Sequence, residues 1–284
     1  MTNNERLSVV LGDRRYDVVR PWGVLPAGRA FGVISQLAVN SKGQVLIFQR
    51  SELPVVVLDQ TGAYLDDWAV GKICDAHGIC VAPDDRVFLV DRDAHQILIL
   101  SACGELSQTL GERHRPHLGA PFNHPTDVAV ARDGDVYVAD GYGNSQVHWY
   151  SSSLERKGSW GRPGTGPGEF STPHGIWVDR ADRVLVADRE NDRVQIFDRE
   201  GTYINEWRDL DHPMDIYEDD RGMIFVTDCI PRLNMFAPDG RLAGRCRATW
   251  NAAHGIWGNR DGDLFLAEQT PSRVTKLCLV DDSG

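Results

Sequence analysis

Three histidines recur at one point of a repeated pattern, and together their side chains could bind a metal ion. His77, His174 and His254 open the apolar runs "HGICV", "HGIWV" and "HGIWG". A single histidine at a strand start is usually structural, and duplication of a repeat could copy it. Three neutral imidazoles with one open position are, however, the ligand set typical of catalytic zinc. The histidines therefore predict a site for zinc or another divalent transition metal, provided that the fold brings them together.

These runs belong to six copies of one sequence pattern. The copies start at intervals of roughly 40 to 50 residues, a period typical of propeller blades. Their equivalent first residues are Ser35, His77, Thr126, His174, Met214 and His254. Each copy has short runs of Val, Ile, Leu and Phe separated by polar turns, which is typical of strands and hairpins. In most copies a fourth run follows, so the sequence predicts an all-β fold, a six-bladed β-propeller.

The ends of the chain are expected to complete this ring. The sixth copy has no fourth run, while residues 13–22, "DRRYDVVRPW", look like a spare strand. We expect this N-terminal strand to pair with the C-terminal blade, which closes the ring and removes exposed sheet edges. No linker interrupts the repeats, so one domain is expected over residues 1–284. Because histidine occurs in every second copy, the three side chains should converge on the central channel about 120° apart.

The second strand of each blade is expected to end on the same face as the histidines. Arg50, Arg92 and Arg189 follow such strands and could hold an anionic substrate, although surface salt bridges are an equally simple role. Tyr142 could act as an acid or base if cationic neighbours lower its pKa, or it could be a buried aromatic residue. Met214, at the histidine position of the fifth copy, is assigned to substrate binding. The acidic residues that end these strands are expected to be structural.

Composition narrows the classes of partner. The 284 residues carry a net charge of −11, with a pI near 5.2, which argues against nucleic acid or an anionic membrane surface as a partner. No apolar run approaches the roughly 18 residues of a membrane span, and we expect a cytoplasmic protein because the N-terminus does not read as a secretory signal. Six cysteines without a CxxC pair are expected to be reduced.

Three segments resemble a known enzyme family. "HPTDVAVARDGDVYVADGYGNSQV", "GEFSTPHGIWV" and "VLVADRENDRVQIF" resemble the catalytic core of the peptidyl-α-hydroxyglycine α-amidating lyases, six-bladed propellers with NHL-type repeats. The resemblance implies that the three histidines bind zinc, that Tyr142 is catalytic, and that Arg50 and Arg189 are active-site arginines. It also implies a carbon–nitrogen lyase that cleaves an α-hydroxyglycine end into an amide and glyoxylate. The substrate could be a peptide C-terminus, a small hydroxylated amide or a related α-hydroxy acid derivative.

The chain departs from the family pattern at several positions. Gly143, Leu185 and Ile196 stand where family members carry cysteine, so the family disulfides are not expected. Gly255 stands where the family has an aspartate that helps to hold calcium, so calcium is in doubt. Ala252 replaces a methionine, which could change the pocket near the third histidine.

Two other functional classes remain open from the sequence. A propeller lactonase or ester-opening lyase would use a carboxylate-rich calcium or magnesium centre, whereas the histidines favour a transition metal. A non-enzymatic NHL-type scaffold would bind another protein on one face and would need no converging histidines.

Overall fold

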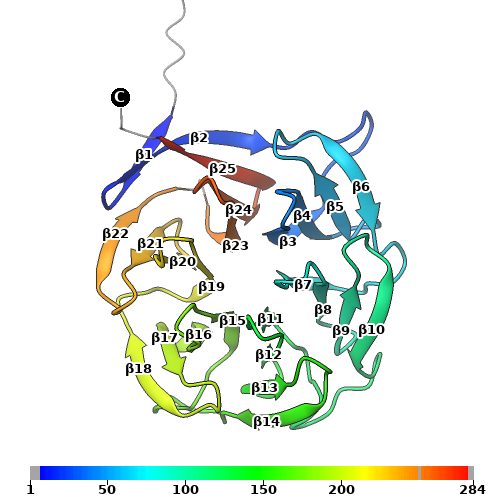
Figure 1. The fold of residues 1–284 in the computed structure, drawn as a ribbon, viewed down its shortest axis with the longest axis vertical. Helices are drawn as coiled ribbons and strands as arrows, with labels where there is room; N and C mark the ends of the chain where they lie inside the picture. The colour runs from blue at the N-terminus through cyan, green and yellow to red at the C-terminus, as the bar shows by residue number, and fades with distance from the viewer. Residues whose placement is uncertain (1–6, 249–250, 281–284) are drawn as a thin grey trace, which may run out of the picture.

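The predicted six-bladed propeller is confirmed by a computed structural model, which describes residues 7–248 and 251–280. Six antiparallel sheets surround a central axis, and Figure 1 looks down this axis. The described residues contain no helix that is long and apolar enough to cross a membrane. The two ends of the predicted domain, residues 1–6 and 281–284, lie outside the described residues.

Each blade is built from strands that follow one another along the chain. Blade 1 contains β3 (Val33–Val39), β4 (Val45–Arg50), β5 (Val55–Leu58) and β6 (Tyr64–Trp68). Blade 2 contains β7 (Ala76–Val81), β8 (Val87–Asp91), β9 (Gln96–Leu100) and β10 (Leu106–Gly111). Blade 3 contains β11 (Asp127–Val130), β12 (Val136–Asp140), β13 (Gln146–Tyr150) and β14 (Arg156–Trp160). The first strand of each of these blades lies next to the axis (Figure 1).

The second half of the ring repeats this order. Blade 4 contains β15 (Pro173–Val178), β16 (Val184–Asp188), the short 3-10 helix η1 (Arg189–Asn191), β17 (Arg193–Phe197) and β18 (Tyr203–Trp207). Blade 5 contains β19 (Pro213–Glu218), β20 (Ile224–Asp228), β21 (Leu233–Phe236) and β22 (Leu242–Cys246). Blade 6 contains β23 (Ala253–Gly258), β24 (Leu264–Gln269) and β25 (Ser272–Val280), and is completed by β1 (Ser8–Leu11) and β2 (Arg14–Trp22).

The predicted closure of the ring is confirmed. β2 pairs with β25 in antiparallel register, with Val18 opposite Leu277 and Tyr16 opposite Leu279. β1, which the sequence had not suggested, adds an outer strand to the same sheet through its pairing with β2. β2 and β25, from opposite ends of the chain, thus lie side by side in Figure 1, and β25 is not left as an open edge.

Neighbouring blades interlock through tryptophan and glycine on the outside of the ring. Trp160 ends the outer strand of blade 3, and Gly201 lies in the last turn of blade 4. A side chain at Gly201 would lie 2.4 Å from the indole, and this glycine has a φ of 89°. Only glycine suits both conditions. Trp68 meets Gly104 in the same way, so the tryptophans that end fourth strands join one blade to the next.

The strand-end carboxylates are structural, as expected. Asp140 is fully buried at the end of β12 and accepts hydrogen bonds from the backbone N–H of Asn123 and from the Asn144 amide. His148 also contacts this carboxylate at 3.0 Å. Asp188 plays the same part in blade 4, where it binds the N–H of Ser171. Asp188 thus fixes the loop that leads into His174, and Asp140 fixes the equivalent loop that leads into Thr126.

Candidate metal and active site

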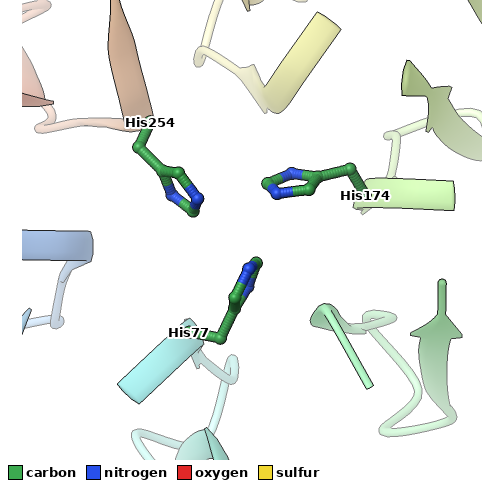
Figure 2. Close-up of side chains that lie close together, drawn as sticks. All are labelled: His77, His174 and His254. Carbon is green, nitrogen blue, oxygen red and sulfur yellow. The ribbon is translucent and has the colours of Figure 1, made fainter. Parts of the chain in front are cut away.

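The three predicted histidines come together on the propeller axis. His77, His174 and His254 begin the inner strands of blades 2, 4 and 6, and their rings point toward one another (Figure 2). The centroids of the three rings are 4.9, 4.9 and 5.0 Å apart. One ring nitrogen from each lies within 4.8 Å of the others, and all three side chains are buried. The spacing in sequence therefore becomes a compact set of three nitrogen donors.

Each imidazole is oriented by a backbone carbonyl of the following blade. The Nδ1 atoms of the three histidines lie 2.6 to 2.7 Å from the carbonyl oxygens of Thr126, Met214 and Ser35. A carbonyl oxygen only accepts, so each Nδ1 carries the proton and the lone pair of each imidazole lies on Nε2. This second contact fixes the tautomer and the ring orientation that a metal ligand requires. The alternate blades that lack histidine thus supply the groups that orient it.

Burial keeps the three histidines neutral. Loss of solvation, with smaller effects from the charges of Arg189 and Arg50, lowers the pKa of His174 from its ordinary 6.5 to about 3. Burial also lowers the pKa of His77 and of His254 well below the ordinary value, and His174 adds to both effects. Neutral imidazoles are the form that binds a metal ion.

The donor set fits zinc. The Nε2 atom of His174 is buried and has no hydrogen-bond partner among the described residues. A hollow of about 10 Å³ lies among the three histidines and Met214, which is space for one ion or one water molecule. Three imidazoles with an open fourth direction match a catalytic zinc site. At Gly255 a side chain would lie 2.7 Å from Cγ of Gln36, so the packing here leaves no room for an aspartate at this position.

Tyr142 reaches the histidines from the loop after β12. Its hydroxyl lies 3.2 Å from Nε2 of His77, and its ring centroid is 6.0 Å from that of His174. The residue keeps 41% of its surface exposed, so it does not belong to the core. It lies at the open end of the channel beside the histidines, which we call the histidine mouth. Partial burial raises the pKa of Tyr142 more than Arg189, Arg92 and Arg50 lower it. The cationic neighbours thus do not lower this pKa below its ordinary value, and the phenol is protonated at neutral pH.

The three arginines gather around the same mouth, and a residue that the sequence did not suggest holds two of them. Asp75 makes ion pairs with Nε of Arg50 at 2.8 Å and Nε of Arg92 at 3.0 Å. The Arg92 guanidinium also lies over the Tyr142 ring, 5.4 Å from its centroid. Asp75 is two residues before His77. Its position in the loop that leads into a histidine strand was the only sequence feature that could have marked it as a site residue.

Arg189 and Met214 occupy the other side of the mouth. Nε of Arg189 is buried without a hydrogen-bond partner among the described residues, which leaves a donor for a ligand. Met214 is buried, and its sulfur accepts a contact from the Cys229 thiol at 3.4 Å. Burial raises the pKa of Cys229, although Arg189 opposes this shift. The fifth blade therefore presents two sulfur atoms, and not a fourth imidazole, beside the histidines.

A second ring of polar side chains lies one residue deeper in the channel. Gln36, Asp127 and Asp215 come from blades 1, 3 and 5 and line the same small hollow as the histidines. Asp215 accepts hydrogen bonds from Nε2 of Gln36 and from the N–H of Ile256, both at 2.8 Å. Burial raises the pKa of Asp215 to about 6 and that of Asp127 well above its ordinary value. Equivalence at the first residue of each repeat did not predict this ring, because its members are the second residues of blades 1, 3 and 5.

Comparison with known proteins agrees with the resemblance seen in the sequence. The NHL repeat family matches residues 122–150 and 170–197. A probable peptidyl-α-hydroxyglycine α-amidating lyase of Caenorhabditis elegans is 27% identical over 91% of this chain and 86% of its own length. Peptidyl-α-hydroxyglycine α-amidating lyase 1 of Drosophila melanogaster is 34% identical over 58% of this chain. This chain spans only 38% of the fly protein's length.

Solved structures share the propeller fold at low sequence identity. A streptogramin B lyase superposes with a TM-score of 0.69 at 14% identity and covers 93% of this chain and 98% of its own. A gluconolactonase from Xanthomonas campestris gives 0.71 at 15% identity, covering 95% and 91%. These likenesses establish the fold alone. The chain is thus a six-bladed β-propeller in which two segments match the NHL repeat, and its sequence is similar to that of proteins named peptidyl-α-hydroxyglycine α-amidating lyases.

Proposed function

We propose that the protein is a metal-dependent carbon–nitrogen lyase that cleaves an α-hydroxyglycine, or a related α-hydroxy acid derivative, at the histidine mouth of the propeller. The observation that carries the proposal is the convergence of three neutral imidazoles with the Tyr142 hydroxyl, which lies 3.2 Å from one of them. The relatives named as amidating lyases support the reaction class. Zinc, held by the three histidines, would polarise an oxygen of the substrate.

The arginines suit the carboxylate of such a substrate. Arg50 and Arg189 both act electrostatically on His174 and on Tyr142, so their charges reach the space between these side chains. A guanidinium binds a carboxylate through two parallel hydrogen bonds, which fixes orientation as well as position. Arg92 lies beside them over the Tyr142 ring and adds to the positive field. The substrate carboxylate would therefore anchor next to the metal site.

The reaction needs one proton to leave oxygen and one to reach nitrogen. When the substrate hydroxyl loses its proton, the oxygen electrons form the carbonyl of glyoxylate, and the C–N bonding pair passes to nitrogen. The amide nitrogen then takes up a proton to give the product amide. Tyr142 is protonated in the resting protein because of its raised pKa, so we assign it the delivery of this proton. The phenolate that results takes up the proton released by the substrate hydroxyl, which restores the resting phenol.

Metal analysis combined with a glyoxylate assay tests the proposal. We expect about one zinc ion per chain and release of glyoxylate from α-hydroxyhippurate. Tyr142→Phe should retain the metal and lose glyoxylate release, whereas His174→Ala should lose both. His212→Ala is the matched control, because this histidine lies outside the cluster and contacts Glu190 at 3.2 Å.

The outcomes separate the metal from the substrate. Stoichiometric zinc without glyoxylate keeps the metal site and removes the α-hydroxyglycine substrate. Calcium or magnesium with no transition metal refutes the zinc assignment and favours a lactonase-type reaction. Metal content that is unchanged in His174→Ala makes the histidine cluster structural.

A further inference from the structure

The far end of the channel is filled on only one side. Three residues beyond the histidine position, the inner strands of blades 4 to 6 carry Trp177, Tyr217 and Trp257, whereas those of blades 1 to 3 carry Ala38, Cys80 and Ala129. The Trp177 ring packs against Tyr217 and Trp257 with centroid distances of 5.5 and 5.1 Å. Large rings thus occupy one half of the channel, while small side chains line the other half.

The unfilled half is part of a cavity of about 550 Å³ that opens on the face opposite the histidines. Its walls are the aromatic cluster (Trp177, Tyr217 and Trp257) on one side and Cys80, Val81, Ala82, Ala129 and Val130 on the other. This volume is typical of small-molecule sites, which lie roughly between 300 and 1,000 Å³. Trp257 packs against the apolar cores of several blades and separates this cavity from His254, about 10 Å away along the strand.

The aromatic cluster is accommodated by a specific glycine. Gly258 follows Trp257 at a position where blades 1 to 4 carry Val39, Val81, Val130 and Val178. A side chain at Gly258 would lie 2.7 Å from the ring and hydroxyl of Tyr217. The sequence thus departs from valine where the aromatic wall needs space.

The cavity also offers hydrogen-bond donors and positive charge. Nε1 of Trp177 is buried and lacks an acceptor among the described residues. Lys42, Arg132 and Arg260 line the cavity from three blades, and the described part of the chain gives none of them a carboxylate partner. Of the carboxylates at the rim, Glu218 is paired with Arg180 at 2.9 Å and Asp85 accepts two hydrogen bonds from Ser41.

Two further carboxylates restrict the charge of a ligand. Asp220 and Asp261 also line the cavity. With Asp85 and Glu218 they balance the four cationic side chains of the lining, Lys42, Arg132, Arg180 and Arg260, so the cavity has no net charge and disfavours a dianion such as a phosphate monoester. A single carboxylate can still be bound by direct contact with an arginine that has no carboxylate partner among the described residues. An aromatic ring of a ligand suits the space between the aromatic cluster and the aliphatic wall opposite it. Edge-to-face contacts between rings stabilise binding beyond the effect of the apolar area that they bury.

We propose that this cavity is a second ligand site, separate from the histidine cluster, for a small aromatic monocarboxylate. The aromatic ring of the ligand lies between the aromatic cluster and the opposite wall, which contains Val81 and Val130. The carboxylate reaches Arg132 or Arg260 at the rim, and an acceptor on the ligand takes the free Trp177 N–H. The site does not depend on metal bound by the histidines.

Binding of 2-naphthoate to the full chain, followed by calorimetry and by tryptophan fluorescence, tests the site. We expect saturable binding of one equivalent, roughly tenfold tighter than that of neutral 2-naphthamide because a charge-assisted hydrogen bond is lost with the amide. We also expect 2-naphthyl phosphate to bind more weakly than 2-naphthoate. Equal binding of acid and amide contradicts the monocarboxylate assignment, and absence of binding overturns the site.

Variants locate the bound probe. Val81→Trp fills the hollow half and should abolish binding, and Arg132→Glu with Arg260→Glu should weaken it at least tenfold if the carboxylate lies at the rim. Arg221→Glu is the matched control, because it sits in the equivalent turn of blade 5 but does not line the cavity. His174→Ala should leave 2-naphthoate binding unchanged even if metal and lyase activity are lost. Binding that disappears in His174→Ala, or that survives the double arginine variant and Val81→Trp, refutes the proposal.

Discussion

Nδ1 of His77 lies 2.6 Å from the carbonyl oxygen of Thr126, which occupies the same point on the next blade as His77 does on its own. His174 and His254 repeat this relationship with Met214 and Ser35. The alternation of histidine with other residues around the ring therefore has a structural purpose. One set of blades supplies donors to the axis, and the other set supplies the carbonyl groups that orient them.

Removal of one imidazole should empty the metal site. We expect His174→Ala to reduce zinc to below a tenth of an equivalent, because two nitrogen ligands and water hold the ion much more weakly. Metal content measured after dialysis checks this. His95→Ala is a suitable control, since its ring packs against His124, 4.2 Å away, and not against the cluster. Retention of zinc by His174→Ala would show that the histidines are not the ligands.

Tyr142→Phe should separate chemistry from metal binding. The phenol is placed to donate a proton, and loss of a general acid typically costs 10² to 10⁴-fold in rate. We expect kcat to fall by about this factor with zinc content unchanged, as measured by steady-state glyoxylate release and metal analysis. An unchanged kcat contradicts the assigned role of Tyr142.

Asp75→Asn should act through the arginines that it holds. Loss of the charge releases Arg50 and Arg92, which Asp75 pairs at 2.8 and 3.0 Å. We expect KM to rise about tenfold and kcat to change less, because substrate orientation depends on both side chains. Asp93→Asn is the control, since Asp93 makes an ion pair with Arg92 but not with Arg50. Equal effects of both variants contradict a positioning role for Asp75.

The metal-free protein should lose stability in acid. Burial lowers the folded-state pKa of His174 from 6.5 to about 3, so the unfolded chain binds more protons between these values. Its contribution is therefore complete above pH 6.5 and is lost as the pH falls toward 3, at up to about 1.4 kcal/mol per pH unit. Urea unfolding at several pH values should show this loss, and His174→Gln should make the dependence shallower. An identical pH profile for the variant contradicts the assignment.

Closure of the ring should contribute strongly to stability. Leu277 is fully buried and lies opposite Val18 of β2, where the two ends of the chain pair. Leu277→Ala should lower the free energy of unfolding by about 2 to 5 kcal/mol, as expected for a buried leucine. Val19→Ala, at a neighbouring position that is 42% exposed, should change it by less than about 1 kcal/mol. Chemical denaturation of both variants measures the difference, and equal losses contradict a closing role.

The repeat made most of the fold predictable from sequence. Six copies with a period of this length allow few architectures, because each sheet must bury both faces against its neighbours. The incomplete sixth copy and the spare segment at 13–22 then predicted which strands close the ring. The histidines were predictable for the same reason, since equivalent residues of alternate blades must converge.

Contacts between loops could not be read from the repeat. Asp75 pairs with arginines of two blades, and nothing in its own copy indicates either partner. The pKa of Tyr142 is raised and not lowered, because the balance of burial against three cations depends on distances that sequence does not contain. Strand β1 was not predicted because it has only four residues, and its pairing with β2 is what makes this segment a strand.

The amino-acid sequence by itself determined the six-bladed ring, its closure and the identity of the three axial histidines, because periodicity and equivalence follow from the order of residues alone. Tertiary structure decided the tautomer of each imidazole, the arginine pair held by Asp75 and the half-filled channel behind Trp257. These features depend on which side chains from different blades approach within a few ångströms of one another, and the folded ring alone sets those distances.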